Sequence, residues 1–92
     1  MVKKLKKMAV YKLFFKPSVE KDLRPIPGAD IKKILQRIEA LSTDPRPSSY
    51  EKLTGQTKCR LRRGNYRIIY TIDNVASNIR IIKIGHRKDV YR

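Results

Sequence analysis

The chain has 92 residues, enough for one domain whose modest core needs neither disulfides nor a structural metal. Its 23 Lys and Arg against 8 Asp and Glu give a formal charge of +15, which favours nucleic acid or an acidic protein as partner. A single cysteine, Cys59, excludes an internal disulfide and a cysteine-based metal site. No apolar run approaches the roughly 18 residues that a membrane span requires.

The N-terminal end is basic, and no clean hydrophobic stretch follows it, so we expect no signal peptide. Residues 1–7 are interpreted as a mobile basic leader that makes non-specific contacts to phosphate. Met8 is a candidate for the true start of a single domain that covers residues 8–92.

The first expected element is a strand over residues 9–15, where β-branched and aromatic side chains predict a place in the interior of a sheet. Pro17 suits the first turn of a helix, and apolar residues recur with helical spacing from Val19 onward. A short helix over residues 17–24 follows, which Pro25 ends.

A second helix is predicted after residue 28, and Asp30 can either cap it or lie in its first turn. One stripe of this helix is apolar: Ile31, Ile34, Leu35, Ile38 and Leu41. The two helices form a hairpin that must bury its apolar side against the sheet. Residues 42–50 are polar and turn-forming, and they lead through an exposed loop to residues 51–55.

Residues 58–73 predict two strands joined by a tight turn at Gly64 and Asn65, two residue types that tolerate positive φ. This turn pairs Arg62 with Arg67 and gives the hairpin one apolar face, made by Cys59, Leu61, Tyr66, Ile68 and Tyr70. Cys59 is therefore expected to be a small buried hydrophobe.

The last strand is predicted over Asn78–Gly85, where nearly continuous isoleucines indicate that both of its faces are covered. The predicted fold is α+β in the order β-α-α-β-β-β. It is a mainly antiparallel, twisted sheet with a two-helix hairpin packed on one face.

The second face of the hairpin gathers three arginines, Arg60, Arg62 and Arg67. Like charges opposite one another destabilise a sheet, and the nearest carboxylate in the sequence, Asp73, lies at the far end. The cluster therefore favours an external polyanion, since a guanidinium group matches phosphate oxygens. The alternative is a solvated basic face with no partner.

Four segments resemble the RelE/ParE superfamily of prokaryotic toxins, and together they cover nearly the whole domain: Phe14–Leu23, Lys52–Gly55, Arg60–Tyr70 and Gly85–Tyr91. The resemblance implies a RelE-like fold and the toxin component of a type II toxin-antitoxin system. The RelE branch consists of ribosome-dependent endoribonucleases that cleave mRNA in the ribosomal A site and so inhibit translation.

The resemblance also implies the partners: mRNA, the ribosome with its rRNA, and a cognate RelB-like antitoxin. A cytoplasmic toxin that is monomeric alone and heteromeric with its antitoxin is expected, without a cofactor. Two alternatives stay open, a ParE-like inhibitor of DNA gyrase and a non-catalytic RNA-binding module.

The catalytic residues implied by the resemblance are Arg60 and Arg62 on the second strand of the family, Arg67 on the third, Arg87 after the last strand, and Tyr91 near the C-terminus. The chain departs from RelE itself in having Arg where RelE has Lys, a shorter spacing before Tyr91, and His86. Five further basic residues are expected to contact RNA: Lys52, Lys58, Arg63, Lys88 and Arg92.

Cutting RNA without a metal requires a base for the ribose 2′-hydroxyl, positive charge for the phosphorane, and an acid for the leaving oxygen. The arginines can supply the positive charge. Candidates for the base are His86, because histidine exchanges protons most readily near neutral pH, and Tyr91. His86 could equally be a structural or surface residue, and Tyr91 could cap the core or stack on a base. No residues have metal-ligand spacing, so a metal-independent enzyme is predicted.

Overall fold

The computed structural model describes residues 10–53 and 57–88. The predicted leader, Met8, Tyr91 and Arg92 lie outside these residues. The elements in chain order are β1 (Lys12–Phe15), α1 (Ser18–Leu23), α2 (Gly28–Ala40), β2 (Glu51–Lys52), β3 (Lys58–Arg63), β4 (Tyr66–Asp73) and β5 (Asn78–His86).

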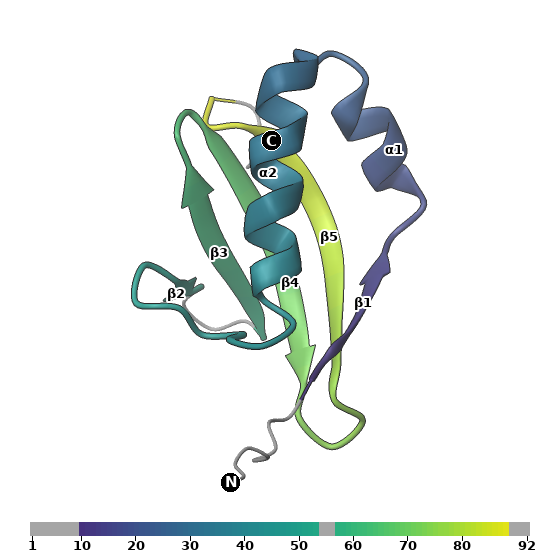
Figure 1. Ribbon diagram of the computed structural model, residues 1–92, viewed down its shortest axis with the longest axis vertical. Coiled ribbons are helices and arrows are strands. Elements are labelled where there is room, and N and C mark those ends of the chain that lie inside the picture. Colours follow the sequence, from purple (N-terminus) through teal and green to yellow (C-terminus); the bar gives the residue numbers. More distant parts are fainter. Residues whose placement is uncertain (1–9, 54–56, 89–92) are drawn as a thin grey trace, which may run out of the picture.

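Five strands form one sheet in the order β1-β5-β4-β3-β2, in which β1 runs parallel to β5 and the other neighbours are antiparallel. α2 crosses one face of this twisted sheet, and α1 lies beside β5 (Figure 1). The predicted α+β class and the mainly antiparallel sheet with a helical hairpin are confirmed. In the part of the chain that the structure describes, no helix is long and apolar enough to cross a membrane.

β1 is an edge strand, so the prediction of an interior strand is wrong. Its aromatic side chains are half exposed, with Phe14 at 42% and Phe15 at 44% of their full accessibility. β1 pairs only with the first half of β5, as far as Ile81. Beyond it the Asp22 carboxylate of α1 accepts a hydrogen bond from the Ile84 backbone N–H at 3.1 Å, which satisfies an edge donor that β1 does not reach.

α2 buries most of the predicted stripe, with Ile31 only partly buried. Ile34, Ile38 and Leu41 are almost fully buried, whereas Leu35 is 40% exposed, so its assignment to the core is wrong. Leu35 follows Ile34 by one residue and therefore lies about 100° further round the helix, since a turn takes about 3.6 residues. Asp30 lies in the first turn and Pro27 holds the cap position.

The β3–β4 hairpin has the predicted register, with Arg62 opposite Arg67 and Cys59 opposite Tyr70. Gly64 has a φ of +60°, but Asn65 does not have positive φ, so the turn uses the freedom of glycine at its first position only. The expected burial of Cys59 is confirmed, and that burial raises the pKa of its thiol.

Two features of the sheet differ from the prediction. Glu51 and Lys52, for which no strand was predicted, form the short strand β2 opposite Arg60 and Cys59. The register between β4 and β5 shifts after Ile69 of β4. Ile69 pairs with Lys83 and Tyr70 with Ile81, so Ile82 of β5 has no direct partner. This bulge, rather than cover on both faces, places Ile79, Ile81 and Ile84 on the helix side, so the reading of β5 as doubly covered is wrong.

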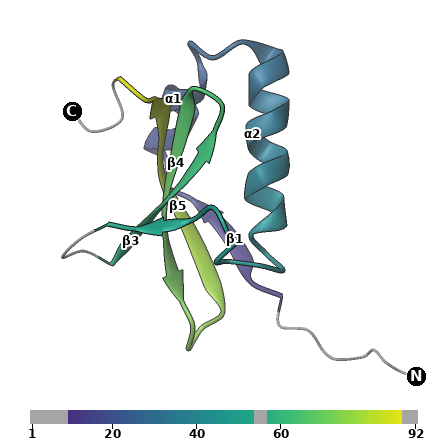
Figure 2. The ribbon, with the colours of Figure 1, turned by 90° about the vertical axis from the view of Figure 1, so that its left-hand side faces the viewer.

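The core lies between the helices and one face of the sheet, and Figure 2 shows α2 on one side of the strands. Tyr70 is fully buried at its centre, and its hydroxyl donates a 2.8 Å hydrogen bond to the carbonyl oxygen of Pro45. Burial raises the pKa of Tyr70 well above its usual value. The core therefore holds the 42–50 loop as well as the helices.

Candidate nucleic-acid interface

The face of the sheet turned away from α2 is strongly basic. Side chains alternate along a strand, so the burial of Leu61 and Ile68 on the helix side places Arg62 and Arg67 on the opposite side. We call this the open face, and its predicted residues are Lys58, Arg60, Arg62 and Arg67.

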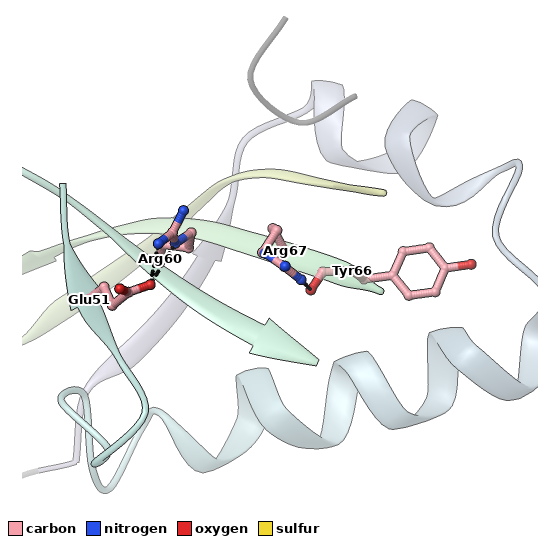
Figure 3. A network of polar contacts seen from close by, with 4 residues as sticks. All are labelled: Glu51, Arg60, Tyr66 and Arg67. Atoms are coloured by element: carbon pink, nitrogen blue, oxygen red, sulfur yellow. Dashed lines mark hydrogen bonds and ion pairs between the residues drawn. The ribbon is translucent and has the colours of Figure 1, made fainter. Parts of the chain in front are cut away.

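Arg62 and Arg67 stand directly opposite each other in the ladder. The Arg67 guanidinium turns back along its own strand, where its Nη1 donates to the carbonyl oxygen of Tyr66 at 3.1 Å (Figure 3). The same nitrogen donates to the carbonyl oxygen of Gly64 in the turn at 3.3 Å. These carbonyls orient the guanidinium.

Arg60 is paired with a carboxylate of the protein, so the prediction of an un-neutralised cluster is wrong for this residue. Its Nε donates to Oε1 of Glu51 at 2.9 Å, and its Nη2 meets the same oxygen (Figure 3). The hydrogen bond and charge of Arg60, helped by Arg62 and Arg67, lower the pKa of Glu51. Sequence reasoning missed Glu51 because the contact depends on β2, whose two residues show no strand periodicity.

Arg87 follows β5 at the same end of the sheet as the hairpin turn. Its backbone N–H donates to the carbonyl oxygen of Asn65 at 2.8 Å, which continues the ladder one step beyond the Tyr66–His86 pair. The exposed Arg87 is therefore held close to the β3–β4 turn.

His86 is not brought together with the arginines. It pairs with Tyr66, and the two rings meet edge to face with centroids 5.9 Å apart. The Tyr66 hydroxyl donates to Asp30 of α2 at 3.4 Å, which places this pair on the helix side. Burial and the Asp30 carboxylate raise the pKa of Tyr66. His86 Nδ1 accepts the Lys88 backbone N–H at 3.2 Å, so that nitrogen carries no proton in this arrangement.

The other predicted RNA contacts are spread over several surfaces. Lys58 is exposed on the open face, whereas Arg63 pairs with Tyr66 on the helix side. Lys52 and Lys88 are exposed, at the β2 edge and after β5 respectively.

The register adds two cations to the open face that the sequence did not suggest. Arg80 stands opposite Thr71, and Lys83 stands opposite Ile69. The bulge at Ile82 hid Lys83, because strict alternation from Ile81 would place Lys83 on the helix side.

Comparison with known proteins agrees with this geometry. A solved toxin-antitoxin complex, RelBE2 from Mycobacterium tuberculosis, contains a chain with a TM-score of 0.75 and 25% identity, which covers 85% of this chain and 99% of that one. The archaeal RelE-RelB complex from Pyrococcus horikoshii gives a TM-score of 0.77 at 28% identity over 88% of this chain and 99% of that one.

The fold and its basic face thus define a small toxin of the RelE-like class. The profile described as ParE toxin of type II toxin-antitoxin system, parDE, matches residues 13–91. The chain belongs to this family of type II toxins, within the RelE/ParE superfamily. Toxin RelG of Mycobacterium tuberculosis is 45% identical over 31 residues, a match that spans 34% of this chain and 36% of RelG.

Proposed function

We propose that this toxin is a metal-independent endoribonuclease that cleaves mRNA in the ribosomal A site and so inhibits translation. The observation that carries the proposal is the direct pairing of Arg62 with Arg67 on the sheet face opposite α2, with Arg60 in the same cluster. Two cations placed opposite each other weaken a sheet, and a bound phosphate would relieve their repulsion.

Arg62 and Arg67 are proposed to stabilise the pentacoordinate phosphorane. Attack by the ribose 2′-hydroxyl adds negative charge to the phosphate oxygens, and guanidinium groups already in place stabilise that charge without reorganisation. Arg87, tied by its backbone to Asn65, would reach the phosphate from the end of the sheet.

Three residues are candidates for the general base, and they lie in different parts of the molecule. Glu51 is on the open face, but the pKa-lowering effect of Arg60 makes it a weak base. His86 lies around the end of the sheet beside Tyr66 and would need RNA to pass that end. Tyr91 remains a candidate outside the described residues.

The ribosome is proposed to supply the orientation that this site lacks. Holding a reactive group in line can lower an activation barrier by about 7–11 kcal/mol. A weak intrinsic site would otherwise have to supply that reduction itself. The two solved structures described above are toxin-antitoxin complexes, RelBE2 and RelE-RelB, so a RelB-like antitoxin is the proposed protein partner that neutralises the toxin.

Inhibition of DNA gyrase is the second candidate, because the matching family carries the ParE name. In that case the open face would bind protein and no message would be cut. A non-catalytic RNA-binding module would bind RNA with neither effect.

The experiment that tests the proposal maps the 5′ ends of messages after brief induction of the toxin. We expect new ends within translated regions, and Arg67→Ala should reduce cleavage by about 10²–10³-fold because one phosphorane contact is lost. Intact messages together with arrested DNA replication would instead identify a gyrase inhibitor.

A matched control removes an equal charge elsewhere. Arg24 is exposed at the C-terminal end of α1, so Arg24→Ala should leave the cleavage pattern unchanged. If Arg24→Ala and Arg67→Ala reduced cleavage equally, general charge rather than the open face would be responsible, and the assignment of Arg67 would be wrong.

A further inference from the structure

A second basic surface lies between α2 and the end of β3. It is a groove of about 390 Å³, lined by Lys33, Gln36, Arg37, Arg62, Arg63 and Gly64. We call it the α2–β3 groove. Four of its six lining residues are cationic, and none of the six is acidic.

The fold creates this groove because β2 is short. β2 covers β3 only as far as the Glu51–Arg60 pair, so no strand of the described chain pairs with the β3 edge at Arg62 and Arg63. α2 passes alongside and contributes Lys33 and Arg37, which are four residues apart and so lie on one side of the helix. The two walls therefore each supply two cations.

One cation in the groove is held in place. Arg37 Nη2 donates to the Ser49 hydroxyl oxygen at 2.9 Å, a neutral partner that orients the guanidinium and leaves its charge in place. An oriented guanidinium loses less freedom when it binds an anion, which favours binding.

The two ends of the groove differ in charge. A neighbouring groove of about 240 Å³ shares Lys33, Arg63 and Gly64, and it contains the Asp30 carboxylate that accepts the Tyr66 hydroxyl. Negative charge at that end disfavours a polyanion. At the other end Arg62 also belongs to the open face, so the two basic surfaces are continuous.

We propose that the α2–β3 groove binds the phosphate backbone of an RNA segment next to the one on the open face. RNA is the favoured occupant because Arg62 joins the groove to a surface already assigned to phosphate, and this inference rests on the proposed function to that extent. A strand that leaves the open face would cross the β3 edge at Arg62 and continue between Arg63 and the two α2 cations.

The test measures how RNA affinity depends on salt. The purified toxin is titrated with a single-stranded RNA bearing 2′-O-methyl groups, which lacks the attacking hydroxyl and so stays intact during the measurement. Each phosphate contact to a single strand contributes about 0.7 to the slope of log affinity against log salt. The slope is negative, and Lys33→Gln with Arg37→Gln should therefore make it shallower by about 1.4. Arg63→Gln alone should make it shallower by about 0.7.

The control is Lys21→Gln with Lys32→Gln, which removes the same charge from exposed helical positions outside the groove. We expect its slope to equal that of the unmodified toxin. Equal slopes for all variants, or an equal fall in the control, would overturn the proposal. Arg63→Gln provides an independent reading from the strand wall if the α2 variant unfolds.

A cleavage assay on ribosomes separates this inference from the proposed function. A toxin that leaves messages intact but shows the groove-dependent slope would overturn the nuclease and support the groove. A toxin that cuts messages while the groove variants keep the full slope would overturn the groove alone.

Discussion

Glu51 introduces a negative charge into an otherwise basic face. Its carboxylate accepts hydrogen bonds from Arg60, and its pKa is lowered first by that hydrogen bond and then by the charges of Arg60, Arg62 and Arg67. The contribution of this pairing is present above the ordinary carboxyl pKa and is lost as the pH falls through the lowered pKa. Glu51 therefore orients Arg60 across the range in which a toxin would act.

Replacement of Glu51 separates orientation from proton transfer. Glu51→Gln keeps an acceptor oxygen for Arg60 but removes the negative charge, so we expect cleavage on ribosomes within about tenfold of the unmodified toxin and tighter RNA binding at low salt. Single-turnover cleavage and anisotropy titration measure the two effects.

A loss of about 10²–10⁴-fold in cleavage would contradict this expectation and identify Glu51 as the general base. Glu39→Gln makes the same chemical change at an exposed position of α2 and should alter neither measurement.

The β3–β4 turn shows how one element sets the geometry of the site. The turn pairs Arg62 with Arg67. Its Gly64 carbonyl oxygen accepts a hydrogen bond from the Arg67 guanidinium, and its Asn65 carbonyl oxygen accepts one from the Arg87 backbone N–H. Gly64 has a φ of +60°, a conformation that side chains with a Cβ rarely adopt. The turn thus depends on a glycine at this position.

Substitution at Gly64 tests that dependence. No heavy atom outside the adjoining residues lies within 4 Å of an added Cβ, so Gly64→Ala should cost only the backbone strain, about 1–2 kcal/mol of the free energy of unfolding. Urea denaturation measures the change.

Gly28 is the matched control, because it opens α2, does not have positive φ, and also has open space around it. Gly28→Ala should leave stability unchanged or raise it by up to about 1 kcal/mol. An equal loss at both glycines would show that positive φ is not the cause.

At the scale of the whole molecule the protein is a two-layer domain with unequal sides. The helix side buries the core, and the open face carries charge. The packing of α2 on the sheet therefore holds the strands of the open face in place. Leu61, between Arg60 and Arg62, and Ile68, next to Arg67, are both buried in the core.

Two positions of α2 test this layering. Ile38 is 1% exposed within the core, so Ile38→Ala should reduce the free energy of unfolding by about 2–5 kcal/mol. Leu35 is 40% exposed on the same helix, so Leu35→Ala should cost less than about 1 kcal/mol. Thermal or denaturant unfolding compares them, and similar losses would contradict the observed orientation of α2.

Local sequence patterns predicted the elements whose apolar residues follow a regular helix or strand spacing. The helical spacing around Val19 and Ile34 and the Gly64 turn predicted both helices and the register of the central hairpin. The misplaced features depend on neighbours far away in the chain. β1 lies at an edge because it pairs only with β5. Leu35 is 40% exposed, in an open groove that it lines with Leu13 and Phe15 of this edge strand.

The sequence by itself determined the alternation that puts Arg60, Arg62 and Arg67 on one face, since a two-residue turn and a period of two leave one register. Only the tertiary structure decided which charges meet. Glu51 reaches Arg60 because β2 pairs with β3. His86 lies on the helix side, away from Arg62 and Arg67, and α2 completes a groove with the β3 edge. These contacts join residues that are distant in sequence, and their geometry follows from how the layers pack, which no local pattern records.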